Sequence, residues 1–187
     1  GTQNACSSSY VLRVTQRTCA RPECPPGRVP DRTAGFTLAV IFATLPGNEM
    51  KIIISKEQLT PAGRSEPLTI AHFSFSSDQQ KALLFTNTQR VWRLNSKGDY
   101  WVYNFNTNAL TQIGKGLSAS SLMFAKFSPD GKTIAYVSQN NLYSEDYASG
   151  KITALTSNGT VSLINGTFDW DYEEEFACRD GFRWSPD

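Results

Sequence analysis

From Met50 onward, short apolar and β-branched runs alternate with polar turns, a pattern typical of antiparallel β proteins. Most of these runs are too short for helices, and residues rich in turn propensity separate them. The predicted strands are residues 51–55, 70–76, 81–86, 100–105, 110–113, 124–128, 133–137, 141–146 and 152–155. We therefore expect an all-β fold.

One turn sequence recurs along this part of the chain. Its three copies are Phe75-Ser-Ser-Asp78, Phe127-Ser-Pro-Asp130 and Trp184-Ser-Pro-Asp187, at intervals of 52 and 57 residues. A four-stranded unit that repeats every 40 to 50 residues or so is typical of β-propeller blades. We predict a partial β-propeller over residues 50–187, with about two four-stranded blades and the beginning of a third. Two insertions account for the longer intervals.

Residues 1–49 differ in composition and are left unassigned as a domain. They contain five of the nine prolines, no lysine, and the cysteines Cys6, Cys19 and Cys24. The cysteine spacing is not that of a usual metal site, and pairing among these cysteines and Cys178 stays open. The apolar run Ala34 to Leu45 is predicted to be a core strand or a signal-like remnant. We expect irregular or disordered structure up to about Gly35. A foreign segment joined to the rest of the chain would also account for the difference in composition.

The most unusual stretch lies near the end of the chain, where residues 169–175 contain five acids interleaved with Trp170 and Tyr172. One hypothesis is a solvated acidic turn. The other is a receptor for an ammonium group, because charge-assisted hydrogen bonds are strong. Glu174 and Glu175 can converge on one ligand only from a helical turn or a bulge, since adjacent strand residues point to opposite faces. We expect the aromatic residues to be buried and to hold the carboxylates near a partly desolvated surface.

Residues 169–175 (DWDYEEE) followed by residues 180–187 (DGFRWSPD) resemble the substrate-amine segment of the dipeptidyl peptidase IV family. The resemblance implies a short helical segment on a β-propeller, in which Glu174 and Glu175 bind the free N-terminal amine of a peptide. Asp171 stands where the relatives usually have an apolar residue. By this resemblance the chain is a fragment of the N-terminal propeller of a dipeptidyl or tripeptidyl serine exopeptidase. The α/β-hydrolase domain would lie outside the sequence.

The insertion Asn87–Asp99 contains a second candidate, Arg93, directly after Trp92. An arginine beside a tryptophan is often a stacked surface pair. In the family, an arginine at the end of this Trp-Arg motif binds a substrate carbonyl oxygen, and Arg93 occupies that place. A cationic Arg93 would also balance Glu174 and Glu175. The predicted substrate-binding residues are therefore Glu174, Glu175 and Arg93.

Signatures of catalysis are absent from the sequence. There is no G-x-S-x-G nucleophile elbow, and the one histidine, His72, lies in a predicted strand, where a packed or edge residue is the usual role. We predict no catalytic residue in this chain, and no metal or cofactor, since the acidic run lacks the spacing and glycine of a calcium-binding loop. The alternative to a peptidase is a non-catalytic propeller module that binds peptides or proteins.

The expected partners are peptides with a free N-terminus and the hydrolase domain of the same parent chain, and the parent is expected to be a homodimer. A formal net charge of +1 gives no indication of nucleic-acid binding. No apolar run reaches 18 residues, so we expect no transmembrane segment here. We expect the parent to be periplasmic, secreted or exposed at the cell surface.

Overall fold

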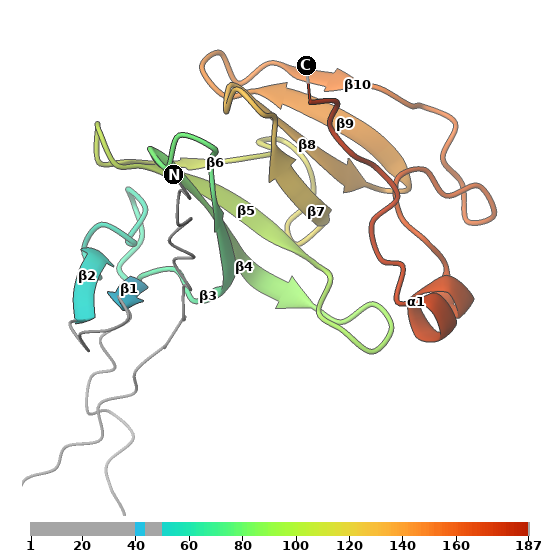
Figure 1. Ribbon diagram of the computed structural model, residues 1–187, viewed down its shortest axis with the longest axis horizontal. Helices are drawn as coiled ribbons and strands as arrows, with labels where there is room; N and C mark the ends of the chain where they lie inside the picture. The colour runs from blue at the N-terminus through green and yellow to red at the C-terminus, as the bar shows by residue number, and fades with distance from the viewer. Residues whose placement is uncertain (1–39, 44–49, 187) are drawn as a thin grey trace, which may run out of the picture. The chain divides into compact units, whose positions relative to one another are not determined.

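The computed structural model describes residues 40–43 and 50–186 (Figure 1). The chain divides into two compact units, residues 1–68 and residues 69–187, and each is described by itself. The predictions made for residues 1–39, including those for Cys6, Cys19 and Cys24, lie outside the described residues. The boundary predicted at residue 49 stays a prediction.

The first unit contains a two-stranded antiparallel pair, β1 (Val40–Ala43) and β2 (Met50–Ile54). Strand β1 falls within the apolar run for which the sequence predicted a core strand or a signal-like remnant, and β2 coincides with the predicted strand at residues 51–55. The turn after β2 is fixed by Gln58, whose side-chain oxygen accepts a hydrogen bond of 2.8 Å from the backbone N–H of Ser55.

The second unit contains two consecutive groups of four antiparallel strands, as the sequence predicted. The first group is β3 (Ile70–Phe75), β4 (Lys81–Gln89), β5 (Lys97–Asn104) and β6 (Ala109–Gln112). The second is β7 (Leu122–Phe127), β8 (Thr133–Ser138), β9 (Asn141–Asp146) and β10 (Ile152–Ala154). Within each group successive strands pair in chain order, and a short pairing of β5 with β7 joins the two groups.

The repeated turn sequence has the same hydrogen bonds in both groups. The hydroxyl of Ser76 donates to Asp78 at 2.5 Å and accepts from the backbone N–H of Lys81 at 3.0 Å. The hydroxyl of Ser128 likewise donates to Asp130 at 2.6 Å and accepts a backbone N–H at 3.0 Å. This identity at the level of atoms establishes the two groups as structural repeats. It also explains why serine and aspartate recur at a fixed spacing.

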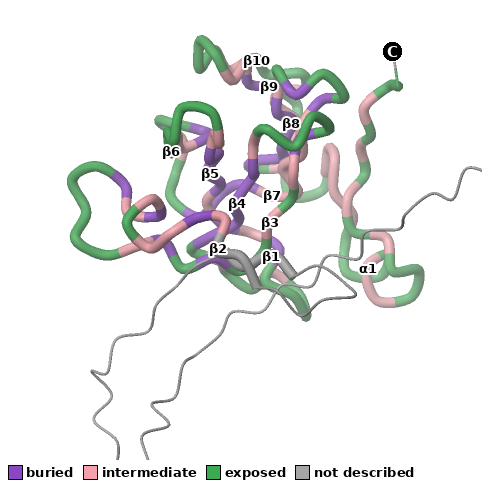
Figure 2. Tube along the Cα trace, turned by 60° about the vertical axis from the view of Figure 1, so that its left-hand side comes forward, coloured by how far each residue is buried: buried purple, intermediate pink, exposed green. Residues whose placement is uncertain are grey.

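The hydrophobic core lies between the two repeats and draws on both. Strands β4, β5 and β8 contribute the most continuous buried stretches (Figure 2). The core side chains are Leu83, Phe85, Tyr100, Val102, Ile113, Leu122, Ile134 and Tyr136. Side chains of both repeats therefore share this core cluster.

A buried carboxylate also connects the repeats. Glu145 on β9 is only 3% exposed, and its Oε2 atom accepts hydrogen bonds from the backbone N–H of Gly114 at 2.8 Å and the hydroxyl of Tyr136 at 3.1 Å. Burial raises the pKa of Glu145 above its ordinary value, although these two donors partly oppose the shift. Gly114 follows β6 of the first repeat, so this hydrogen bond crosses the boundary between the repeats.

The insertion predicted for Asn87–Asp99 is shorter in the structure. Strand β4 continues to Gln89 and β5 begins at Lys97, so only the tip is irregular. The register shifts between Thr86 and Gln89, which lets the hairpin extend past the predicted strand end. In the part of the chain that the structure describes, no helix has the length and apolarity needed to cross a membrane.

Candidate functional site

The acidic run forms a short helix, α1 (Trp170–Phe176), which is one of the two local structures, a helical turn or a bulge, that the sequence analysis allowed. The carboxylate of Asp169 caps the helix by accepting the backbone N–H of Tyr172 at 3.2 Å. Ala177 ends it in the left-handed conformation, with φ 52°. Asp171 and Glu173 in the first turn suit the positive end of the helix dipole. The local sequence thus explains the start of α1.

The excursion that carries α1 is closed at its base. Thr167 and Asp180 form an antiparallel bridge, and the backbone N–H of Gly181 donates to the carbonyl of Gly166 at 2.9 Å. Lys126 on β7 forms an ion pair with Asp180 and donates to the carbonyl of Phe182 at 3.0 Å. Burial alone would raise the pKa of Asp180, but Lys126 and then Arg183 outweigh it and the pKa lies below its ordinary value. These contacts hold α1 on the second repeat.

Arg93 lies at the tip of the β4–β5 hairpin, which extends toward α1 in Figure 1. The tip is closed by a hydrogen bond of 3.1 Å from the backbone N–H of Val91 to the carbonyl of Leu94. Arg90 reinforces it by donating from Nε to the carbonyl of Trp92 at 2.8 Å. The first repeat therefore presents Arg93 on a turn with defined backbone contacts.

Arg93 and Glu174 meet across the two repeats. The Nε atom of Arg93 lies 2.6 Å from Oε2 of Glu174, and the two side chains are 73% and 6% exposed. The other carboxylate oxygen of Glu174, Oε1, is buried and has no hydrogen-bond partner among the described residues. The pair is therefore asymmetric: a solvent-exposed guanidinium covers a carboxylate that is almost completely buried and only half satisfied.

The third predicted residue, Glu175, does not share this environment. It is exposed, and within residues 53–186 no hydrogen bond or ion pair engages its side chain. Glu173, which the sequence analysis did not select, has a buried Oε1 atom without a partner in the described part of the chain. Sequence alone could not rank three consecutive glutamates by burial, because their burial depends on how α1 sits on the second repeat.

The expectation that the aromatic residues of this segment are buried is wrong. Trp170, Tyr172 and Phe176 are 49%, 48% and 69% exposed, and α1 contains no fully buried residue (Figure 2). The ring of Tyr172 stacks on Phe168 with centroids 5.4 Å apart and is tilted against Phe176 at 5.7 Å, so the rings pack mainly on each other. The side chain of α1 that is buried is the carboxylate of Glu174, and the aromatic rings are exposed.

This arrangement suits a ligand that combines a cation with a neighbouring acceptor. A buried carboxylate oxygen without a donor is unfavourable, and an ammonium group supplies up to three N–H donors. The guanidinium of Arg93 contacts Glu174 through Nε, and its exposed end has further donors for a carbonyl oxygen. Among the described residues, no group of three or more His, Cys, Asp or Glu side chains is arranged to hold a metal ion.

The family model for the "Dipeptidyl peptidase IV (DPP IV) N-terminal region" matches residues 76–187, which include β4 to β10 and α1. The chain belongs to the dipeptidyl peptidase IV family. The match begins at Ser76, so it covers nearly all of the second unit and omits the first. It also includes Arg93, Glu173, Glu174 and Glu175.

Curated relatives and a solved structure agree with the dipeptidyl peptidase IV assignment. The chain is 36% identical over 121 residues to dipeptidyl aminopeptidase B of Saccharomyces cerevisiae, covering 64% of the chain and 14% of that protein. It is 32% identical over 143 residues to a putative dipeptidyl aminopeptidase of Schizosaccharomyces pombe, covering 76% of the chain and 18% of that protein. The chain thus spans less than a fifth of the length of these relatives.

The crystal structure of Porphyromonas gingivalis dipeptidyl peptidase 4 superposes with a TM-score of 0.65 at 23% identity, covering 77% of the chain and 21% of that structure. At this identity the similarity concerns the fold. Together with the two four-stranded repeats, it confirms the predicted all-β, partial β-propeller architecture. In the terms of that architecture, β3–β6 and β7–β10 are two blades.

Proposed function

We propose that this chain is the substrate-amine-binding part of a dipeptidyl or tripeptidyl peptidase IV-like serine exopeptidase. In this proposal Glu174 and Glu175 bind the α-ammonium group of a peptide, and Arg93 orients the first carbonyl oxygen. The observation that carries the proposal is the ion pair of 2.6 Å between Arg93 and a buried Glu174 whose second carboxylate oxygen is unpartnered. An α-ammonium next to a peptide carbonyl complements these two groups.

The contribution of the site would be positioning. Fixing the N-terminus of a peptide sets how far along the chain the scissile bond lies from a nucleophile, and correct placement supplies a large part of many rate enhancements. The nucleophile and its base would belong to an α/β-hydrolase domain of the full-length protein. A peptide bound only at its amine would then lose a fixed number of residues per cleavage, as in an exopeptidase.

The proposal is tested by asking whether hydrolysis requires a free amine on the substrate. Two chromogenic dipeptide substrates, identical except that one is N-acetylated, are compared with the full-length protein that contains this chain. Acetylation removes the positive charge and the ammonium donors, and hydrogen bonds to charged groups contribute about 1.5–3 kcal/mol each. We expect kcat/KM for the acetylated substrate to be lower by about 100-fold or more, from two such bonds. Equal values for the two substrates would contradict the proposal.

A non-catalytic peptide-binding module is the second candidate. One observation favours this candidate. Arg93 and Glu174, the residues proposed to contact the ligand, both belong to this chain, so the proposed contacts with the ligand involve no residue of a hydrolase domain. In this case the full-length protein binds a free-amine peptide more tightly than its acetylated form but hydrolyses neither. For the full-length protein we further expect a homodimer in a periplasmic, secreted or cell-surface location, as in the sequence analysis.

A further inference from the structure

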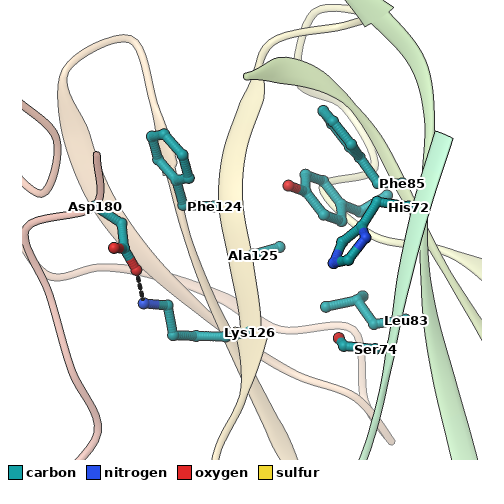
Figure 3. A pocket seen from close by; sticks show the side chains of 9 residues that line it. His72, Ser74, Leu83, Phe85, Phe124, Ala125, Lys126 and Asp180 are labelled. Carbon is teal, nitrogen blue, oxygen red and sulfur yellow. Dashed lines mark hydrogen bonds and ion pairs between the residues drawn. The ribbon is translucent and has the colours of Figure 1, made fainter. Parts of the chain in front are cut away.

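A separate pocket lies between strands of the two blades. It has a volume of about 310 Å³, and Figure 3 shows the side chains that line it. Strands β3, β4 and β5 form one wall, and β7 with Asp180 forms the other. The lining residues are His72, Ser74, Leu83, Phe85, Tyr100, Phe124, Ala125, Lys126 and Asp180. Neither Arg93 nor Glu174 contributes to it.

The strand register explains why the pocket has polar groups on an apolar wall. His72 lies directly opposite Phe85 in the β3–β4 pairing, and Ser74 lies opposite Leu83. Directly opposed residues point to the same face of a sheet, so His72 and Ser74 occupy the face that Leu83 and Phe85 use for the core. Apolar residues at these two positions would continue the core, whereas a histidine and a serine interrupt it.

The opposite wall is formed by an irregular part of β7. The register shifts between Met123 and Lys126, and Phe124 has a φ of 54°, which is unusual for an aromatic residue. Tyr100 on β5, which is almost completely buried, lines the pocket together with Phe124 and Ala125 of this bulge. In Figure 3 the small side chain of Ala125 points into the gap toward His72. Bulges that redirect side chains often lie next to functional sites.

Apart from Tyr100 and one ion pair, the polar side chains that line the pocket are those of His72 and Ser74. Within residues 53–186, no hydrogen bond engages the side chain of His72 or Ser74. Lys126 and Asp180 form the ion pair drawn in Figure 3, and Arg183 also contacts Asp180 at 2.9 Å. The rings of Phe85 and Tyr100 stack with centroids 4.7 Å apart and provide a flat apolar surface. The carboxylate and the ammonium group that line the pocket are therefore already engaged in ion pairs.

We infer that this pocket binds a neutral aromatic ring carrying a hydroxyl group, the chemistry of a phenol or a tyrosine side chain. The ring packs against Leu83, Phe85 and Ala125, and the hydroxyl exchanges a hydrogen bond with Ser74 or His72. A volume near the lower end of ligand pockets, about 300–1,000 Å³, suits one ring and not a larger ligand. This inference does not depend on the proposed peptidase function.

The test is a titration of the full-length protein with 4-methylphenol, toluene and N-acetyltyrosinamide, followed by ligand-observed NMR or calorimetry. One net hydrogen bond, about 0.5–1.5 kcal/mol, predicts that 4-methylphenol binds about 2- to 12-fold more tightly than toluene. Binding of N-acetyltyrosinamide as well would identify a peptide side chain as an occupant, whereas binding of 4-methylphenol alone would identify a small phenol. Failure of 4-methylphenol to bind, or affinity no better than that of toluene, would overturn the inference.

Substitutions of the lining residues test whether the ligand binds in this pocket. Ala125→Leu fills the gap and is expected to weaken binding of 4-methylphenol more than tenfold, while Ala148→Leu, at an exposed turn residue, leaves it unchanged. Ser74 is exposed, so Ser74→Ala tests the hydrogen bond without disturbing the fold, and together with His72→Leu it should abolish the preference over toluene. Glu174→Gln, outside the pocket, should leave the affinity for 4-methylphenol unchanged. An unchanged preference in the Ser74/His72 double variant, or equal affinity in the two leucine variants, would count against this pocket.

Discussion

The Nε atom of Arg93 lies 2.6 Å from Oε2 of Glu174, although the two residues belong to different blades. The guanidinium is mostly exposed and the carboxylate is almost completely buried. The hairpin tip that carries Arg93 and the helix that carries Glu174 each interrupt the regular propeller strands. The candidate site is therefore assembled from two insertions, and neither of them could form it alone.

The first prediction concerns this ion pair. Arg93→Ala leaves a buried carboxylate with neither oxygen paired to a described residue, and an unsatisfied buried charged group costs about 1–3 kcal/mol or more. We expect the backbone amides of α1 to lose protection in hydrogen exchange by a corresponding amount in the full-length protein. Arg179→Ala is the matched control, because Arg179 is exposed close to α1. Equal protection in the two variants would argue against a supporting role for Arg93.

The second prediction concerns pH. Burial raises the pKa of Glu145 above its ordinary value of 4.5, so the folded state retains a proton that the unfolded chain releases. The contribution of Glu145 to stability is then fully present below pH 4.5 or so and falls as pH rises through the folded pKa.

Glu145→Gln cannot ionise and keeps an acceptor for Gly114 and Tyr136. Its stability relative to the unmodified protein should therefore increase as pH is raised above about 4.5, measured as a difference in Tm at pH values from 4 to 8. The other titrating groups are present in both proteins, so their effects cancel in this difference in Tm. A difference in Tm that does not vary with pH would show that the pKa of Glu145 is not raised by folding.

The third prediction concerns the turn that donates to Glu145. Gly114 has a φ of 70°, and a Cβ atom there would lie 2.8 Å from a methyl group of Leu122. Gly116 has a φ of 91°, but a Cβ atom there would meet nothing within 4 Å. Both alanine substitutions carry backbone strain, and only Gly114→Ala adds a clash, so we expect it to be more destabilising by about 1–3 kcal/mol in denaturant unfolding. Equal effects would mean that Leu122 moves aside freely.

Much of the blade structure could be predicted from the sequence, because it depends on local patterns. Strands β3 to β10 follow the apolar runs, and the Ser-x-Asp turns recur because their hydrogen bonds are made within a few residues, as at Ser76 and Asp78. A helical turn or a bulge at Glu174 was expected for a similar reason, since adjacent side chains diverge on a strand, and the family resemblance implied the helix.

The rest depends on contacts between distant segments. The aromatic residues of α1 were expected to be buried, but Tyr172 packs chiefly on neighbouring rings while Glu174 is buried. Whether a helix of seven residues turns its rings or its carboxylates inward depends on the surface beneath it. The pocket beside His72 was also beyond prediction, because it requires the bulge in β7 and the β3–β4 register together.

The most direct measurement of the central claim is kcat/KM of the full-length protein for the free-amine and N-acetylated substrates in Glu174→Gln. Asp171→Asn is the control, since Asp171 is an exposed acid on the same helix. Loss of one charged hydrogen-bond partner, about 1.5–3 kcal/mol, predicts that the ratio of the two values falls about 10- to 100-fold in Glu174→Gln and stays near that of the unmodified protein in Asp171→Asn. A ratio that Glu174→Gln leaves unchanged would contradict the assignment of Glu174 to the peptide amine.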